Sequence, residues 1–338
     1  MLRHVIIAAL FITATAAARA EETPAQAAPG GVLGEIAPGN GCVLDEQAAQ
    51  FEKRKAAGPK TEVRMSLGDL TLTLYPRDPD VDTADGDLPL EFLTIARRES
   101  AGGETCEHII ADANVFIVWA RPEMPDGYSA AEPAPLAILS SYSGGAHCCT
   151  TLYALFPGKE FKLQSLELGN AEAALTQDWA GGAPHLTFGD DSFAYWNTSY
   201  AGSPGGGVKL DWSPEGYKLS DSMRSDAPDD AALAAMRDEI KAALVEFGGP
   251  YTAQGSTGDI PPTKGELDPV IWSDLLDLIY GGHADIAAKL FDDAWPAEVK
   301  GKRAFWRDFV KQMEATWIWE PWNLKDQLDP EMKFEQGE

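Results

Sequence analysis

The spacing of apolar residues changes once along the chain, near residue 225, and this change constrains the fold more than any other feature. Before it, short stretches alternate or are rich in β-branched and aromatic residues, and Gly, Pro and Asp separate them. These stretches are residues 62–66, 70–74, 90–96, 108–110, 115–120, 136–141, 150–156, 161–168, 185–188, 192–196, 208–212 and 217–220. Gly68-Asp69 between the first two is typical of a hairpin turn. The pattern predicts a β-rich domain, either a sandwich or a small propeller-like meander.

After residue 225 the apolar residues recur at helical spacing. Pro228-Asp229-Asp230 is typical of a helix start, and Gly248-Gly249-Pro250 is typical of a helix end. Further helices are expected over residues 268–280, 284–294 and 302–316. The sequence therefore predicts an α+β fold in which three regions follow the N-terminal segments. They are a β-rich domain of residues 42–222, a helical region of 226–325 and an acidic tail of 326–338.

Residues 1–20 have the layout of a secretory signal peptide. One arginine precedes an uncharged, mostly apolar run over residues 5–17, and Ala18-Arg19-Ala20 is an A-x-A cleavage site. The alternative is a retained anchor, but this run is shorter than the about 20 residues that span a bilayer. We expect cleavage before Glu21, no membrane span afterwards and a periplasmic or secreted protein. Residues 21–41, rich in Ala, Pro and Gly, predict a flexible leader.

The charge of the chain limits its partners. Asp and Glu number 53 against 27 Lys and Arg, which gives a formal net charge of -26. Nucleic acid and anionic lipid need a positive surface on the protein that contacts them, so both are poor candidates. The acidity favours solubility and, if the partner is charged, a basic one.

Four cysteines, Cys42, Cys106, Cys148 and Cys149, lie after the predicted signal peptide. An even number in an exported chain predicts two disulfides. Bonding Cys148 to Cys149 would close a strained ring, so we expect each to pair with one of the two distant cysteines. Which pairs with which is left open. The alternative is a metal site, or a nucleophile with its base, made of His147 and a neighbouring thiolate, but disulfides would consume the thiolates.

The string Ser143-Gly144-Gly145-Ala146-His147-Cys148-Cys149-Thr150 resembles a motif of exported bacterial proteins to which no activity is assigned, and the likeness covers residues 135–165. Residues 178–182 more loosely resemble FG-GAP-type propeller repeats, which implies a propeller. A weak internal repeat also relates residues 141–145 to 199–203 and residues 161–163 to 217–219. It suggests two copies of one β unit.

Four residues are candidates for binding. Tyr142 and His147 belong to the glycine-rich string, whereas Trp319 and Trp322 follow the last expected helix. An exposed pair of indoles there could stack on a sugar or a partner side chain. Five aspartates within residues 78–87 could bind Ca²⁺, but in so acidic a chain we interpret them as a solvated run.

No catalytic motif stands out. Ser141 occupies the first glycine position of a G-x-S-x-G elbow around Ser143, and the sequence carries neither metal-ligand spacing nor a phosphate loop. We therefore predict no catalytic residue, metal or cofactor. The preferred hypothesis is a non-enzymatic binding protein of the cell envelope with a protein or glycan partner. The alternative is a secreted hydrolase whose carboxylates are dispersed in the sequence, which a deep pocket with two converging carboxylates would favour.

Overall fold

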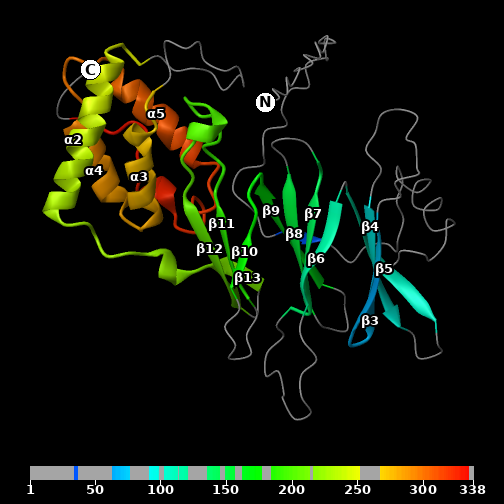
Figure 1. Cartoon of the computed structure of the whole chain (residues 1–338). Coiled ribbons are helices and arrows are strands. Elements are labelled where there is room, and N and C mark those ends of the chain that lie inside the picture. Colours follow the sequence, from blue (N-terminus) through cyan, green and yellow to red (C-terminus); the bar gives the residue numbers. More distant parts are fainter. Residues whose placement is uncertain are drawn as a thin grey trace, which may run out of the picture.

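The protein consists of three antiparallel β-sheets followed by a group of helices. Figure 1 shows the sheets side by side, with the helices gathered beyond the last of them. The computed structural model describes residues 34–36, 63–76, 91–98, 103–112, 114–120, 135–144, 149–156, 162–176, 184–213, 216–251 and 267–334. The predicted α+β fold, with strands first and helices after them, is confirmed.

Each sheet is a meander of consecutive strands. The first sheet contains β2 (Val63–Leu67), β3 (Leu70–Tyr75), β4 (Glu91–Arg98) and β5 (Glu104–Asp112). The middle sheet contains β6 (Asn114–Ala120), β7 (Ala137–Tyr142), β8 (Thr150–Phe156) and β9 (Lys162–Gly169), and β1 (Gly34–Ile36) pairs with β9. The third sheet contains β10 (Ala174–Thr176), β11 (His185–Gly189), β12 (Gly207–Ser213) and β13 (Gly216–Leu219).

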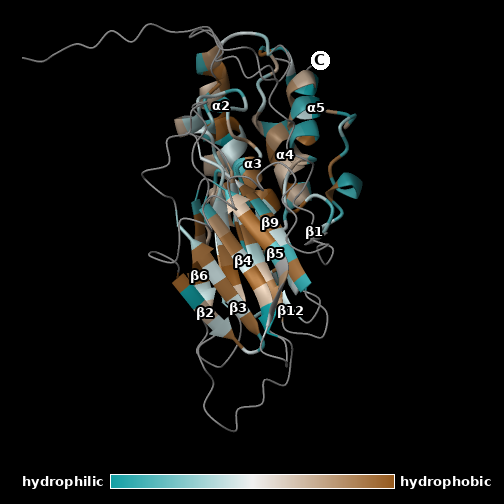
Figure 2. Cartoon of the chain, turned by 90° about the vertical axis from the view of Figure 1, so that its right-hand side faces the viewer, coloured by the Kyte–Doolittle hydropathy of each residue, from teal (hydrophilic) through white to brown (hydrophobic). Residues whose placement is uncertain are grey.

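The middle sheet is buried on both faces because its strands alternate between two cores. Leu139 and Leu155 pack with the leucines and isoleucines of the first sheet. Ile138 of β7 and Leu152 of β8 point to the opposite face of the sheet and join the core that contains the third sheet and the helices. This double burial explains why every residue of β7 except the last, Tyr142, is buried rather than every second one. Hydrophobic residues also run along the strands of the first sheet, which faces the viewer in Figure 2.

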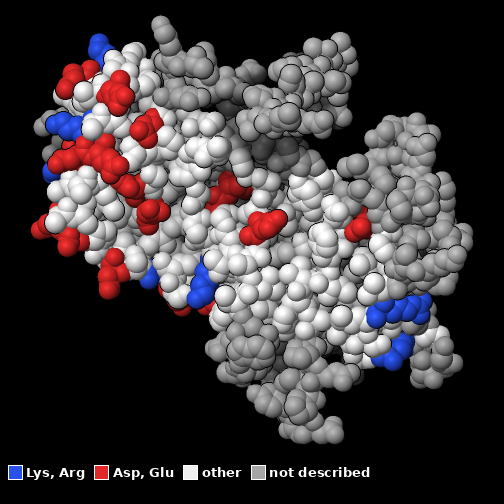
Figure 3. All heavy atoms as spheres, in the orientation of Figure 1, with Lys and Arg blue, Asp and Glu red and all other residues white. Residues whose placement is uncertain are grey.

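The helical region contains α2 (Asp230–Phe247), α3 (Val270–Tyr280), α4 (Ala284–Ala294) and α5 (Lys302–Met313). The predicted limits of α2 are confirmed. The Asp229 carboxylate accepts the N–H of Ala232 at the start, and Gly248 ends the helix with a φ of 62°. Acidic side chains gather over this region, whereas the described surface of the sheets is mostly uncharged on the face in Figure 3.

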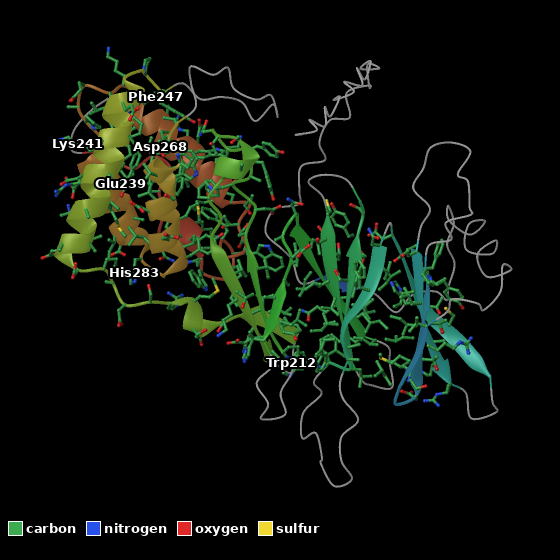
Figure 4. All side chains as sticks on the ribbon, viewed as in Figure 1. Trp212, Glu239, Lys241, Phe247, Asp268 and His283 are labelled. Carbon is green, nitrogen blue, oxygen red and sulfur yellow. The ribbon has the colours of Figure 1, made fainter. Side chains whose placement is uncertain are left out.

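Aromatic side chains join the layers. The ring of Trp212 stacks on that of Phe156 at a centroid distance of 4.9 Å, which connects β12 to β8. Figure 4 shows Trp212 at the end of the third sheet that is remote from the helices, while Glu239, Lys241 and Phe247 mark the outer helix α2. Phe188 of β11 meets Trp317, after α5, edge to face at 5.0 Å. One extended core therefore runs from the middle sheet to the helices.

Local predictions held where neighbouring residues decide the structure. Gly68-Asp69 forms the two-residue turn between β2 and β3, with Leu67 opposite Leu70. Gly68 has a φ of 62°, a conformation that glycine adopts without a steric penalty. Among the described residues, no helix is long and apolar enough to cross a membrane.

Two predicted segments differ in the structure. The strand expected over residues 192–196 is wrong, because this segment forms turns in which Phe193 is buried and Tyr195 is exposed. The segment expected to be a flexible leader contains β1, which pairs with β9. The acidic tail is packed at least as far as Phe334, whose ring meets that of Phe291 at 5.8 Å.

Candidate functional site

A cavity of about 480 Å³ opens on the middle sheet, on the face that the third sheet partly covers. Side chains of three adjacent strands form its floor, and the connection from β9 to β10 forms a wall. Its lining residues are Phe116, Val118, Ser140, Tyr142, Thr150, Leu152, Asn170, Glu172 and Ala173. The cavity therefore forms where one face of the middle sheet meets the β9–β10 connection.

The apolar part of the cavity comes mainly from β6, the edge strand of the middle sheet. Phe116 is 50% exposed and Val118 is 41% exposed, although both are large apolar side chains. The pairing of β6 with β7 shifts between Ile117 and Trp119, so Val118 is the extra residue of a β-bulge. Bulges protect edge strands from pairing with other chains, and they also redirect side chains near binding sites. Here the bulge residue lines the cavity.

The polar part of the cavity consists of hydroxyl groups, an amide and a single carboxylate. Ser140, Tyr142 and Thr150 lie on one face of β7 and β8, where Tyr142 pairs with Thr150. Asn170 and Glu172 come from the β9–β10 connection. Glu172 is the only charged residue among the described residues that line the cavity. Four uncharged hydrogen-bonding side chains thus accompany one carboxylate.

The wall of the cavity is fixed by hydrogen bonds from Asn170 to the β11–β12 connection. The backbone N–H of Asn170 donates to the Asp191 carboxylate at 2.8 Å, and the Asn170 amide nitrogen donates to the Tyr200 hydroxyl oxygen. Gly169 is required beside this contact, since its φ is 62° and an added Cβ would lie 2.4 Å from the Asp191 carboxylate. Burial raises the pKa of Asp191, while the hydrogen bond from Asn170 opposes the shift.

The β11–β12 connection, residues 190–206, is itself anchored to the helices. Asp190 is 3% exposed, and its carboxylate accepts the hydroxyl of Tyr280 at 2.6 Å and the N–H of Trp317 at 2.9 Å. It also accepts the N–H of Ser192 at 2.9 Å and the Ser192 hydroxyl. A chain of contacts therefore runs from the cavity wall through this connection to α3 and the segment after α5.

The same connection presents two tyrosines. The ring centroids of Tyr195 and Tyr200 are 5.3 Å apart, and Tyr195 is 46% exposed. Tyr195 has a φ of 60° and Asn197 a φ of 55°. Positive φ is sterically unfavourable for a bulky residue such as Tyr and is found where the surrounding structure enforces it. Tyr200 touches the cavity wall through Asn170, so this aromatic pair adjoins the cavity.

A second polar cluster lies on the third sheet. His185 Nδ1 lies 2.6 Å from the Asp211 carboxylate, which also accepts the Ser220 hydroxyl. Burial tends to raise the pKa of Asp211, but the hydrogen bonds from Ser220 and His185 outweigh this and lower it. A serine nucleophile needs its hydroxyl on the histidine. Because Ser220 donates to the carboxylate instead, the three residues do not form that arrangement.

Of the four predicted binding residues, Tyr142 is the one that the structure places in the cavity. His147 lies outside the described residues. The described residues on either side of it are joined, because the Ser143 N–H donates to the Cys149 carbonyl at 3.1 Å and the Cys149 N–H donates to the Ser143 hydroxyl at 2.8 Å. Their neighbours Tyr142 and Thr150 line the cavity.

The expected exposed pair of tryptophans does not form. Trp319 is 8% exposed and belongs to the core. Trp322 is half-buried, and the Arg224 guanidinium lies 4.6 Å from its ring centroid. The indoles instead pack the segment after α5 against the rest of the protein, since aromatic rings contribute large buried areas.

The remaining predictions concern cysteines and metals. Neither Cys106 nor Cys149 is a free thiol, while Cys42 and Cys148 lie outside the described residues, so the pairing stays a prediction. The aspartates of residues 78–87 also lie outside them. Within the ranges that the structure describes, no group of His, Cys, Asp and Glu is arranged to hold a metal ion.

Sequence reasoning missed most of the cavity. No local motif marks the lining residues Phe116, Asn170 and Glu172. Tyr195, which lies beside the cavity, belongs to residues 192–196, whose aromatic content suggested a strand. The internal repeat relates positions that correspond in the structure, since Tyr142 ends β7 just before the second connection of the middle sheet and Tyr200 lies in the second connection of the third sheet. Comparisons with protein-family models, curated proteins and solved structures found no match to this chain.

Proposed function

We propose that the protein is an exported binding protein that holds a glycan in the cavity on the middle sheet. The observation that carries the proposal is the composition of the cavity. A half-exposed phenylalanine, Phe116, faces the same space as three hydroxyl groups, an amide and one carboxylate. Export is expected from the signal peptide of residues 1–20.

The chemistry of a sugar fits this lining. A sugar ring has an apolar face that can lie on an aromatic ring and a rim of hydroxyl groups that can bond to Ser, Thr, Tyr, Asn and Glu. A phosphate or carboxylate ligand would need cations, and no Lys or Arg is among the described lining residues. A simple ammonium ligand would use Glu172 and Phe116 but would leave the hydroxyl groups of the strands without a role.

Binding is favoured over hydrolysis by the number of carboxylates. Most glycoside hydrolases use two carboxyl groups, one on each side of the scissile bond. Glu172 is the only carboxyl group among the described lining residues, and Asp191 is engaged by the backbone of Asn170. The alternative of a hydrolase with dispersed carboxylates is therefore less well supported than a binding protein.

The proposal can be tested with the purified mature chain on an array of neutral, acidic and amine-bearing oligosaccharides, followed by calorimetric titration of the best ligands. Phe116→Ala should lower affinity at least tenfold, which corresponds to about 1.4 kcal/mol. Val118→Ala should lower it less. Val63→Ala is the matched control, because Val63 is 52% exposed on the first sheet and lies outside the cavity lining.

The charge of the ligand is tested separately with Glu172→Gln. For a neutral sugar this variant should retain measurable binding, because the amide still offers an acceptor oxygen. Glu167→Gln, at an exposed position of β9, is the control. If only amines bind, and if Glu172→Gln abolishes that binding, the ligand is a cation and not a glycan. If no sugar binds, or if Phe116→Ala weakens the binding of none, the proposal is overturned.

A further inference from the structure

The turn that contains Tyr195, one of the two tyrosines beside the cavity, does not require a tyrosine. Tyr195 sits at a φ of 60°, where glycine or asparagine meets less steric resistance. The turn there is needed to bury the flanking rings, since Phe193 is buried and Trp196 packs edge to face on Trp272 at 5.1 Å. A small residue at position 195 would allow the same turn. The conformation of the turn therefore does not account for an exposed tyrosine ring at this position.

The backbone at Tyr195 is also held in place before any ligand arrives. Its backbone N–H donates to the Ser203 hydroxyl at 2.9 Å, and this hydroxyl donates to the Ser199 carbonyl at 3.0 Å. The base of the connection is closed by the N–H of Asp190, which donates to the Gly206 carbonyl at 2.8 Å. Little ordering is then required on binding, which is the property of an effective recognition surface.

The position of the pair relates it to the cavity. Tyr200 contacts Asn170, a lining residue, and Tyr195 packs against Tyr200 with an angle of 41° between the rings. The aromatic surface therefore begins at the cavity wall and continues outward in the direction of solvent. Tyrosine suits such a role because its ring is apolar and its hydroxyl is polar.

We propose that Tyr195 and Tyr200 form a second subsite that stacks on a sugar unit adjoining the one in the cavity, so that the ligand is an oligosaccharide and not a single sugar. This inference rests on the proposed glycan binding. It adds a requirement for chain length, which the cavity alone does not impose. Selectivity for longer chains would then come from the β11–β12 connection rather than from the middle sheet.

The test compares a monosaccharide with linear oligomers of two to six units of the best array ligand, measured by calorimetric titration. Tyr195→Gly keeps the turn and removes the ring, so the melting temperature should be retained or raised. It should lower the affinity for the longer oligomers at least tenfold and leave the monosaccharide within about twofold. Tyr195→Phe, which keeps the ring, should bind nearly as the natural protein, and Val63→Ala is again the control.

The outcomes separate this inference from the proposed function. If Phe116→Ala abolishes sugar binding while Tyr195→Gly leaves the affinities for all chain lengths unchanged, the subsite is refuted and the glycan cavity stands. If no sugar binds, both fall. If Tyr195→Gly weakens all ligands equally, including the monosaccharide, the pair belongs to the cavity and the length requirement is refuted.

Discussion

Substitution of Asp190 by alanine should destabilise the protein more than most single changes, because this carboxylate joins the third sheet to the helices. Its removal leaves the buried hydroxyl of Tyr280 and the N–H of Trp317 without their acceptor. The Ser192 hydroxyl keeps a partner, since it also donates to the Ala315 carbonyl at 2.8 Å. An unsatisfied buried donor costs about 1–3 kcal/mol, so two predict a loss of about 2–6 kcal/mol in the free energy of unfolding.

The assay is urea unfolding followed by tryptophan fluorescence, with the slope of the transition checked against that of the natural protein. Tyr280→Phe removes only one of these donors and should cost about 1.5–3 kcal/mol, the range for a hydrogen bond to a charged group. In the double variant the two losses should not add, because both include the same contact.

Asp238→Ala provides the control, since the Asp238 side chain is 71% exposed on α2. It should change the free energy of unfolding by less than about 0.5 kcal/mol. If Asp190→Ala falls within the same limit, the carboxylate does not hold the connection and the reasoning is refuted. Full additivity of Asp190→Ala with Tyr280→Phe would also contradict the contact.

Three further results are expected. Asp191→Asn should raise stability at pH 7, because burial raises the pKa of Asp191 and penalises its charged form in the folded state. This advantage should shrink as the pH falls through the raised pKa and be gone below about 4, where the carboxyl group is protonated in both states; pH-dependent urea unfolding measures this. Lys302→Met should lower the free energy of unfolding, measured by thermal unfolding, by about 3 kcal/mol. The reason is that Asp292 loses the buried ammonium group that donates to both its carboxylate and its carbonyl. Unchanged stability would contradict the role of this pair. Peptide mapping without reduction should show no free thiol, and Cys149→Ser should cost about 2–5 kcal/mol; a reactive thiol in the oxidised protein would refute the disulfide framework.

Features set by neighbouring residues could be predicted from the sequence. The turn at Gly68-Asp69 and the limits of α2 follow from backbone conformations and caps that act within a few residues. The four-stranded meanders also leave a trace, because the internal repeat relates the second connection and the fourth strand of the middle sheet to those of the third. These signals are local, or they repeat a local unit, and a single sequence displays them.

The strand expected over residues 192–196 shows where such signals mislead. Aromatic residues are frequent in strands, but here Phe193 and Trp196 bury their rings among the helices, and Asp190 accepts donors from residues 90 and 127 positions away. Propensity counts residue types and has no access to these distant partners. The tryptophans near residue 320 were misassigned for the same reason, since burial depends on what packs against them.

The sequence alone determined the order of strands and helices, the turns and caps that delimit several of them, and the acidity that disfavours polyanionic partners. The tertiary structure decided where the cavity forms. Phe116, Tyr142 and Glu172 lie on separate elements, and the pairing of β6 with β7 and the hydrogen bond from Asn170 to Asp191 bring them to one cavity. Apolar periodicity records which face of a strand is buried, but it does not record which other sheet covers that face or where the cover ends.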